Sequence, residues 1–347
     1  MQAKNRVVSL DILRISCMFL IVLTHGMIWG MPFQTPKSTL WLNNVLYPLF
    51  SALTSFSVNC FVLISGYFLS KSYSYKFTKA FKIWLQTLFY SVLLWCVFKF
   101  VLNRTDSSFV SSALPIANDL YWFVTQYLIL LVLSPFLARF CDSLDKKTYQ
   151  ALLLLLFFLT GSIIMEFPFG KLLFHDSRTP LFLFLFMIAG YIARYDLPTW
   201  LEENSGKLFI TILVIQWGGG LFLNQWHQET GYIYGAFSTS GGGLSLFSST
   251  ALLIWTRKQD WNQNKVALSA ASAAPFVFGV YLIHDNLFVR PFLWEKMDVY
   301  RFWDSWLFFP VLLVVCTGVF LTCLLLDAIR AAIFKLPSSL VKRRKQS

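Results

Sequence analysis

Residues 9–26 read SLDILRISCMFLIVLTHG, an apolar stretch with an arginine near its start and a histidine near its end. Arg14 and His25 are eleven residues apart. In a helix this is about three turns, so both side chains project from nearly the same face, about 16 Å apart along the axis. An arginine within an apolar span needs an ionic partner, a cavity or access to water. We therefore expect this helix to serve a function as well as to cross a membrane.

The rest of the chain is also built from apolar blocks. Of its 347 residues, 56% are hydrophobic and 13% are charged, and the mean hydropathy is +0.60. A soluble domain carries about 25% charged residues. Long blocks without amphipathic rhythm are typical of transmembrane helices. The sequence therefore predicts an all-α, polytopic transmembrane helical bundle, a single domain over residues 1–347 with no separate soluble domain. Division at the polar clusters gives ten expected spans: 9–29, 45–69, 83–102, 120–140, 149–165, 180–195, 207–225, 241–256, 267–289 and 305–329.

The net charge of +12 is unevenly placed along these spans. When the loops are assigned to alternate sides, one side receives most of the lysines and arginines. The other side receives only Lys37, Lys99, Arg104, Lys171, Arg178, Arg290, Lys296 and Arg301. The positive-inside rule then predicts that both termini are cytoplasmic. Arg14 would lie near the cytoplasmic face and His25 near the opposite face. This distribution indicates a membrane protein in contact with lipid and gives no reason to expect a nucleic-acid partner.

The cysteines and the first apolar block have simple interpretations. The six cysteines show no close CxxC pairing, so we expect small core residues and no disulfide framework or metal site. The first block has a basic flank, as a signal peptide has, but it contains Arg14 and no small-residue cleavage pattern follows it. We therefore expect it to be a helix of the mature protein.

Three further features are candidates for function, and each has a structural alternative. Lys76, Lys79 and Lys82 recur every three residues, so they fall on one broad face of a helix and suit a phosphate group; alternatively they anchor the helix at the cytoplasmic surface. Gly66, in the segment ISGY, is expected to allow close helix packing. His284, in the segment YLIHDN, lies beside Asp285 in a plausible polar cluster, although adjacent residues of a helix do not face each other; alternatively it caps the helix at the interface. Arg14 itself can extend to the membrane surface or pair with Asp11.

These features together resemble the acyltransferase-3 family of integral membrane proteins. The first helix of that family carries an arginine or lysine followed by ten residues and a histidine, which Arg14 and His25 match. The other matching landmarks, in the family's order, are Ile64–Tyr67 (ISGY), a basic stretch after it, Tyr121-Trp122-Phe123 with Leu133-Ser134-Pro135, and Gly279–His284 (GVYLIH). One departure is Lys79-Ala-Phe-Lys82, where the family often has Arg-x-x-Arg. Lysine holds phosphate as a point charge and loses the bidentate geometry of arginine.

The resemblance implies a membrane-bound O-acyltransferase. It would move an acyl group, usually acetyl, from cytoplasmic acetyl-CoA to a hydroxyl of an extracellular or lipid-linked polysaccharide, without a metal, in the cell membrane. On this hypothesis Arg14, Lys76, Lys79 and Lys82 bind the phosphates of the donor, and His25 acts as the base or carries the acyl group. Position alone indicates acceptor-binding roles for Asp119, Tyr121, Trp122, Glu166 and His284. The competing hypothesis is a transporter or flippase of lipid-linked sugars, in which Arg14 and His25 bind substrate or relay protons. The oligomeric state stays open.

Overall fold

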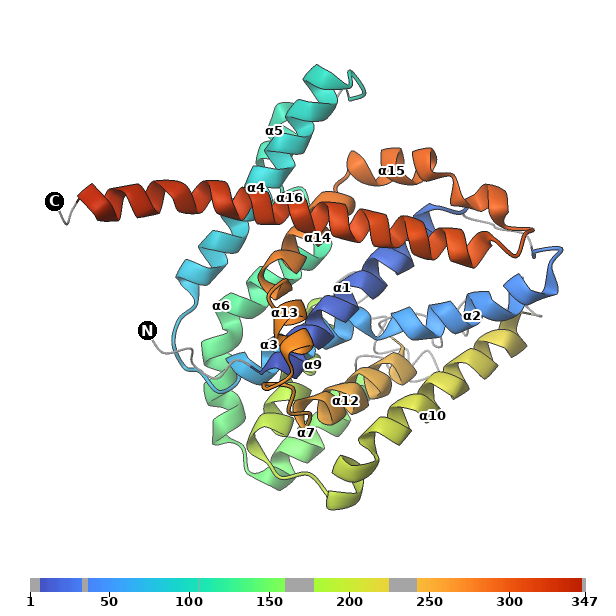
Figure 1. Cartoon of the computed structure of the whole chain (residues 1–347). Helices are drawn as coiled ribbons and strands as arrows, with labels where there is room; N and C mark the ends of the chain where they lie inside the picture. The colour runs from blue at the N-terminus through green and yellow to red at the C-terminus, as the bar shows by residue number, and fades with distance from the viewer. Residues whose placement is uncertain (1–6, 33–36, 106, 160–177, 225–241, 345–347) are drawn as a thin grey trace.

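The computed structural model contains only helices and connecting segments in the part of the chain that it describes, which comprises residues 7–32, 37–105, 107–159, 178–224 and 242–344. This confirms the all-α prediction (Figure 1). The α-helices are α1 (Val8–Trp29), α2 (Trp41–Ser55), α3 (Ser57–Leu69), α4 (Phe77–Cys96), α5 (Phe109–Ala113), α6 (Trp122–Ser143), α7 (Lys146–Leu159), α9 (Thr179–Arg194), α10 (Thr199–Asn224), α12 (Gly243–Arg257), α13 (Lys265–Ala271), α14 (Val277–His284), α15 (Val289–Met297) and α16 (Phe308–Arg344). Short turns of other helix types are η1 (Val97–Val101), η2 (Ala274–Phe276) and η3 (Val299–Phe302).

In the described residues each of the ten expected spans overlaps a helix, but the helices differ in length, and residues 160–165, 225 and 241 of these spans lie outside the described part. Within the described residues, seven helical segments are long and apolar enough to cross a membrane: Val8–Trp29, Trp41–Leu69, Phe77–Val101, Trp122–Ser143, Thr199–Phe222, Lys265–His284 and Phe308–Phe334. The chain is thus an integral membrane protein. The helices α7, α9 and α12 have 14, 16 and 15 residues, which is shorter than the roughly 20 that a bilayer core requires. Spans at these three places stay a prediction.

Helix α1 lies at the centre of the bundle, where it packs against α3, α14 and α16 (Figure 1). Its last turns approach α16 so closely that a side chain at Gly26 has no room. A Cβ atom on Gly26 would lie 2.9 Å from Sγ of Cys316 and 3.0 Å from Leu312. About two helical turns before Gly26, the ring of Phe19 packs edge-on against Phe320, with ring centroids 5.9 Å apart. The end of α1 therefore meets the start of α16, and the two helices run antiparallel.

This antiparallel pairing places the start of α1 and the later part of α16 at the same end of the bundle. That arrangement is what two termini on one side of a membrane require. Which side is cytoplasmic stays a prediction from the distribution of lysine and arginine.

Helix α14 is only eight residues long and is held by a buried polar cluster on α16. A Cβ atom on Gly279 would lie 2.1 Å from Cγ of Asp327, so only glycine allows this contact. The Asp327 carboxylate accepts hydrogen bonds from Tyr90 at 2.8 Å and Gln86 at 3.0 Å, both on α4, and from Arg330 at 2.7 Å. Because a buried carboxylate is costly without partners, this cluster fixes α4, α14 and α16 relative to one another.

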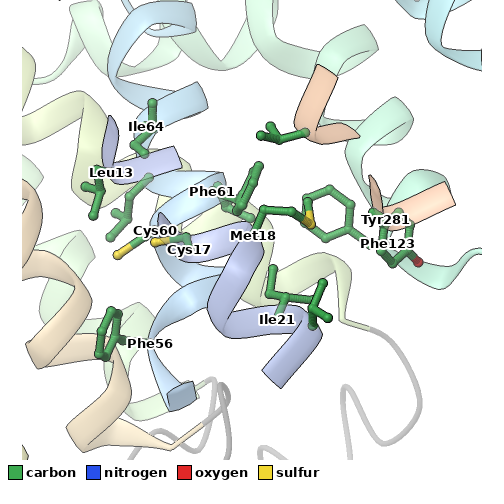
Figure 2. Close-up of a cluster of buried hydrophobic side chains, with 14 of the residues drawn as sticks. Leu13, Cys17, Met18, Ile21, Phe56, Cys60, Phe61, Ile64, Phe123 and Tyr281 are labelled. Carbon is green, nitrogen blue, oxygen red and sulfur yellow. The ribbon is translucent and has the colours of Figure 1, made fainter. Parts of the chain in front are cut away.

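The core between α1 and α3 contains small residues and sulfur atoms among large apolar side chains (Figure 2). Cys17 and Cys60 are fully buried there, and all six cysteines are free. Five of the six are buried, as expected of small core residues, and Cys96 is half-buried. The packing role of Gly66 is confirmed as well, since a Cβ atom on it would lie 3.0 Å from Cβ of Ala189 on α9.

Candidate active site

The structure brings together the two histidines that the sequence places in α1 and at the end of α14. Nδ1 of His25 lies 2.9 Å from Nε2 of His284, and the ring centroids are 5.0 Å apart. The His284 side chain is fully buried, whereas 17% of the His25 side chain is exposed. The partly exposed imidazole of His25 is therefore positioned by the buried imidazole of His284.

The hydrogen bonds indicate which nitrogen of each ring carries the proton. The carbonyl oxygen of Val280 lies 2.6 Å from Nδ1 of His284. A carbonyl can only accept, so this nitrogen carries a hydrogen, and in a neutral ring Nε2 of His284 is then an acceptor. It receives the hydrogen on Nδ1 of His25, which leaves Nε2 of His25 with its lone pair. Among the described residues, every hydrogen bond and ion pair to the His25 side chain uses Nδ1. The network therefore prepares Nε2 of His25 to act as a base or nucleophile.

The buried carboxylate of Asp285 lies next to the His25–His284 pair. Oδ1 of Asp285, whose side chain is 4% exposed, lies 3.5 Å from Nδ1 of His25 and 3.2 Å from Nη1 of Arg290. The Arg290 guanidinium stacks on the Trp29 ring at 4.1 Å. Since an opposite charge at this distance favours a protonated imidazole, Asp285 can stabilise His25 after it takes up a proton. Arg290 in turn compensates the buried charge of Asp285.

The segment after α14 is positioned by Tyr121 and Asn286. The Tyr121 hydroxyl, fully buried, donates to the carbonyl oxygen of Leu282 at 3.1 Å and accepts from Nδ2 of Asn286 at 2.7 Å. Oδ1 of Asn286 accepts from the backbone N–H of Phe288 at 3.0 Å, where the chain turns toward α15. These bonds support the turn that carries His284 and Asp285.

Helix geometry explains how neighbouring residues both reach His25. Side chains at adjacent positions of a helix point in different directions. The helix ends at His284, and Asp285 has φ −96° and ψ 8°, outside the helical region. The direction of the Asp285 side chain is therefore not set by the helix, and both Asp285 and His284 contact the imidazole of His25. Asp285 was noted from the sequence beside His284 in a polar cluster, but the rule that adjacent helix residues do not face each other counted against it. Arg290 was not selected from the sequence. The sequence signal for the cluster was the polar run HDN directly after an apolar helix.

A pocket of about 560 Å³ adjoins this site. It lies between the end of α1 and α15, and its lining residues are Trp29, Gly30, Met31, Pro32, Leu287, Arg290, Pro291, Trp294, Glu295, Asp298 and Tyr300. Arg290 belongs both to the pocket wall and to the ion pair with Asp285. Trp29 is one turn after His25 on α1, so the two side chains share a helix face. Neither histidine is among the lining residues, and Arg290 is the residue that joins the pocket wall to the Asp285–His25 pair.

At the other end of α1, Arg14 is paired. Its Nη1 atom lies 3.2 Å from Oδ1 of Asp11, and 27% of its side chain is exposed. The ion pair with Asp11 is therefore present, and the guanidinium is still accessible to a ligand.

The three lysines occupy the start of α4 and differ in their surroundings. Nζ of Lys76 donates to the hydroxyls of Ser72 and Ser74, at 2.8 Å and 2.5 Å. Lys79 lies 3.4 Å from the hydroxyl of Tyr127, and Lys82 is exposed. Helix α4 packs on α6 and α14. A shared anion site of these lysines with Arg14 stays a prediction.

A row of aromatic rings connects the lysine end of the bundle with the histidines. The ring of Tyr127, next to Lys79, stacks on Phe123 at 5.8 Å. Phe123 contacts Tyr281 at 5.8 Å, and Tyr281 contacts His284 at 6.4 Å. Figure 2 shows Phe123 and Tyr281 next to each other, with Met18 of α1 pointing toward them. The row follows α6 and α14 along α1 toward His25.

The remaining acceptor-binding candidates are not gathered around His25. Trp122 stacks beneath the Arg178 guanidinium at 3.9 Å, and Asp119 accepts a hydrogen bond from Thr125 at 2.8 Å. Tyr121 is enclosed behind the site, which suits positioning better than contact with an acceptor. Glu166 lies outside the described residues. Of these candidates, the structure brings only His284 into direct contact with His25.

The fold and the site define a class of protein, a polytopic helical membrane protein with an oriented imidazole base inside the bundle. The chain belongs to the acyltransferase-3 family, because the family model described as an acyltransferase domain matches residues 7–327, nearly the whole chain. It is therefore an acyltransferase, and the predicted family is confirmed. No curated protein and no solved structure matches the chain.

Proposed function

We propose that this acyltransferase moves an acetyl group from cytoplasmic acetyl-CoA to a hydroxyl of an extracellular or lipid-linked glycan, in the cell membrane. The observation that carries the proposal is the hydrogen-bond chain from Val280 through His284 to His25. This chain leaves a lone pair on Nε2 of His25. A base oriented in this way is what acyl transfer to a hydroxyl requires, because a neutral hydroxyl is a weak nucleophile.

The reaction then balances with His25 as the only proton carrier. Nε2 of His25 takes the proton of the acceptor hydroxyl as its oxygen attacks the thioester carbonyl carbon. The new C–O bond forms and the C–S bond breaks. The departing thiolate of CoA receives the proton from His25, which restores the neutral imidazole. Asp285, 3.5 Å from Nδ1, stabilises the imidazolium in between.

The donor is proposed to reach His25 from the basic end of the bundle. Arg14, Lys76, Lys79 and Lys82 would hold its phosphates as cations. Arg14 and His25 are about 16 Å apart along α1, a separation that suits a long ligand with an anionic head and a reactive end. The row of rings from Tyr127 to Tyr281 lies between the two ends, and the extended arm is proposed to run beside it.

The alternative of a flippase without acyl transfer has less support. Membership of an acyltransferase family favours chemistry on an acyl donor. Mass spectrometry of surface glycans separates the two functions. Loss of an acetyl increment in cells without the gene supports the acyltransferase, and truncated or missing glycan supports the flippase.

The direct test uses the purified protein in lipid vesicles with acetyl-CoA and glycan acceptors. Release of the CoA thiol and acetylation of the acceptor are measured together. We expect His25→Ala to lower the transfer rate by about 10²–10⁴-fold, the contribution of a general base. His227→Ala, which removes a histidine outside the described residues, is the matched control and is expected to retain the rate. A folded His25→Ala protein with the native transfer rate would refute the proposal. Detection of acetyl on His25 would replace direct transfer by a covalent intermediate.

A further inference from the structure

The pocket beside His25 has the composition of a sugar site. Trp29 is 48% exposed and Tyr300 is half-buried, and both rings belong to the lining; Trp294, also in the lining, is buried beneath them. A pyranose ring presents C–H faces that pack on aromatic rings, and its hydroxyls need hydrogen-bond partners at the edge. Glu295 and Asp298 supply such partners. The volume of about 560 Å³ is within the range of small-molecule sites.

The charges of the pocket lining are mainly negative. Glu295 and Asp298 are both exposed side chains of the lining. The one basic residue in the lining, Arg290, is already engaged by Asp285 at 3.2 Å and by the face of Trp29. Two other basic residues of this segment, Lys296 and Arg301, are exposed and are not in the lining. Among the described lining residues, an anionic ligand would therefore face two carboxylates and no unengaged cation.

We propose that this pocket binds the acceptor and selects a neutral sugar over one that carries a carboxylate. The inference rests on the proposed function, because it assumes that the acceptor is a glycan. It goes further by assigning the acceptor subsite to the end of α1 and to α15 (Figure 1). The hydroxyl that reacts belongs to the sugar ring bound in this pocket. That ring packs on Trp29, which lies one helical turn after His25 on α1. Glu295 and Asp298 determine specificity by accepting hydrogen bonds from hydroxyls and by repelling acidic groups.

The test compares acceptors that differ only at one carbon. Methyl glucoside is paired with methyl glucuronide, and methyl galactoside with methyl galacturonide, each with acetyl-CoA and the full chain in vesicles. We expect kcat/KM for the neutral member to exceed that for the uronide by about tenfold or more, since each of the two exposed carboxylates repels a carboxylate about 4 Å away by a factor of about five. In the double variant Glu295→Gln with Asp298→Asn, we expect this ratio to fall to about threefold or less. We expect the single variant Glu295→Gln, at an exposed position, to give an intermediate ratio. It replaces the double variant in the test if the double variant does not fold.

Lys296→Gln is the matched control, because it changes a charge on α15 outside the pocket. We expect it to leave the ratio of neutral sugar to uronide unchanged. A wild-type ratio of one or less overturns the inference, and so does a ratio that the pocket variants leave unchanged. A change in Lys296→Gln as large as in the double variant overturns the assignment to the pocket. Transfer to none of the four sugars overturns the proposed function itself, so the two failures are distinguishable.

Discussion

The strongest prediction concerns His284, which orients the base without touching the reacting atoms. Its Nε2 accepts the hydrogen on Nδ1 of His25 at 2.9 Å, and this bond selects the tautomer with a free Nε2. A buried hydrogen bond of this kind contributes about 1–3 kcal/mol. Because about 1.4 kcal/mol corresponds to a factor of ten in rate, we expect His284→Ala to lower kcat by about 5- to 150-fold. The effect should be smaller than that of His25→Ala.

The assay for this prediction is the steady-state rate of acetyl transfer, with KM for acetyl-CoA measured alongside. We expect the loss to lie in kcat, with KM nearly unchanged, since His284 contacts His25 and not the donor end. His284→Gln offers a side-chain oxygen as acceptor and should recover part of the rate. A folded His284→Ala protein with a native kcat would refute the tautomer argument. A loss equal to that of His25→Ala would show that His284 itself takes part in the chemistry.

Three further predictions test other parts of the structure. Arg14→Gln should raise KM for acetyl-CoA at least severalfold while kcat changes little, which steady-state kinetics in vesicles would show. Gly279→Ala should lower the thermal unfolding temperature, because its Cβ atom would overlap Asp327, and a retained unfolding temperature would contradict this contact. Hydrogen bonds from the Thr39 and Ser38 segment lower the pKa of Asp304. Asp304 therefore stabilises the fold at pH above its unfolded-state pKa, and this stabilisation is lost as the pH falls through the folded-state pKa. Asp304→Asn should remove that part of the acid dependence in unfolding experiments.

The first helix shows how much could be predicted from the sequence. Its apolar run fixed α1 to within one residue, Ser9–Trp29 against Val8–Trp29. The spacing of Arg14 and His25 follows from helical geometry alone, so no tertiary information was needed. The ion pair of Arg14 with Asp11 is equally local, because the partners are three residues apart.

The site around His25 depends on contacts that sequence spacing does not contain. His25 and His284 are 259 positions apart, and only the packing of α14 against α1 joins them. The argument that adjacent helix residues point apart was sound for a continuing helix. It failed for Asp285 because the predicted span of residues 267–289 ends earlier, at His284. The polar run HDN marked this end, but the apolar residues that follow it, Leu287 and Phe288, led to a longer predicted span.

Because His284 donates to the carbonyl oxygen of Val280, the backbone of one short helix, α14, determines which nitrogen of His284, and in turn of His25, carries the proton. A rotation of α14 by a single residue would remove Nε2 of His284 from His25 and expose a different side chain to α1. A working site therefore requires that α1 and α14 keep their relative rotation, and Arg290 of α15 is tied to the same cluster through Asp285. In protein engineering, α1 and residues 277–286 therefore have to be transferred together. Chimeras that exchange one of them without the other should fold and yet be inactive, even when every catalytic side chain is retained.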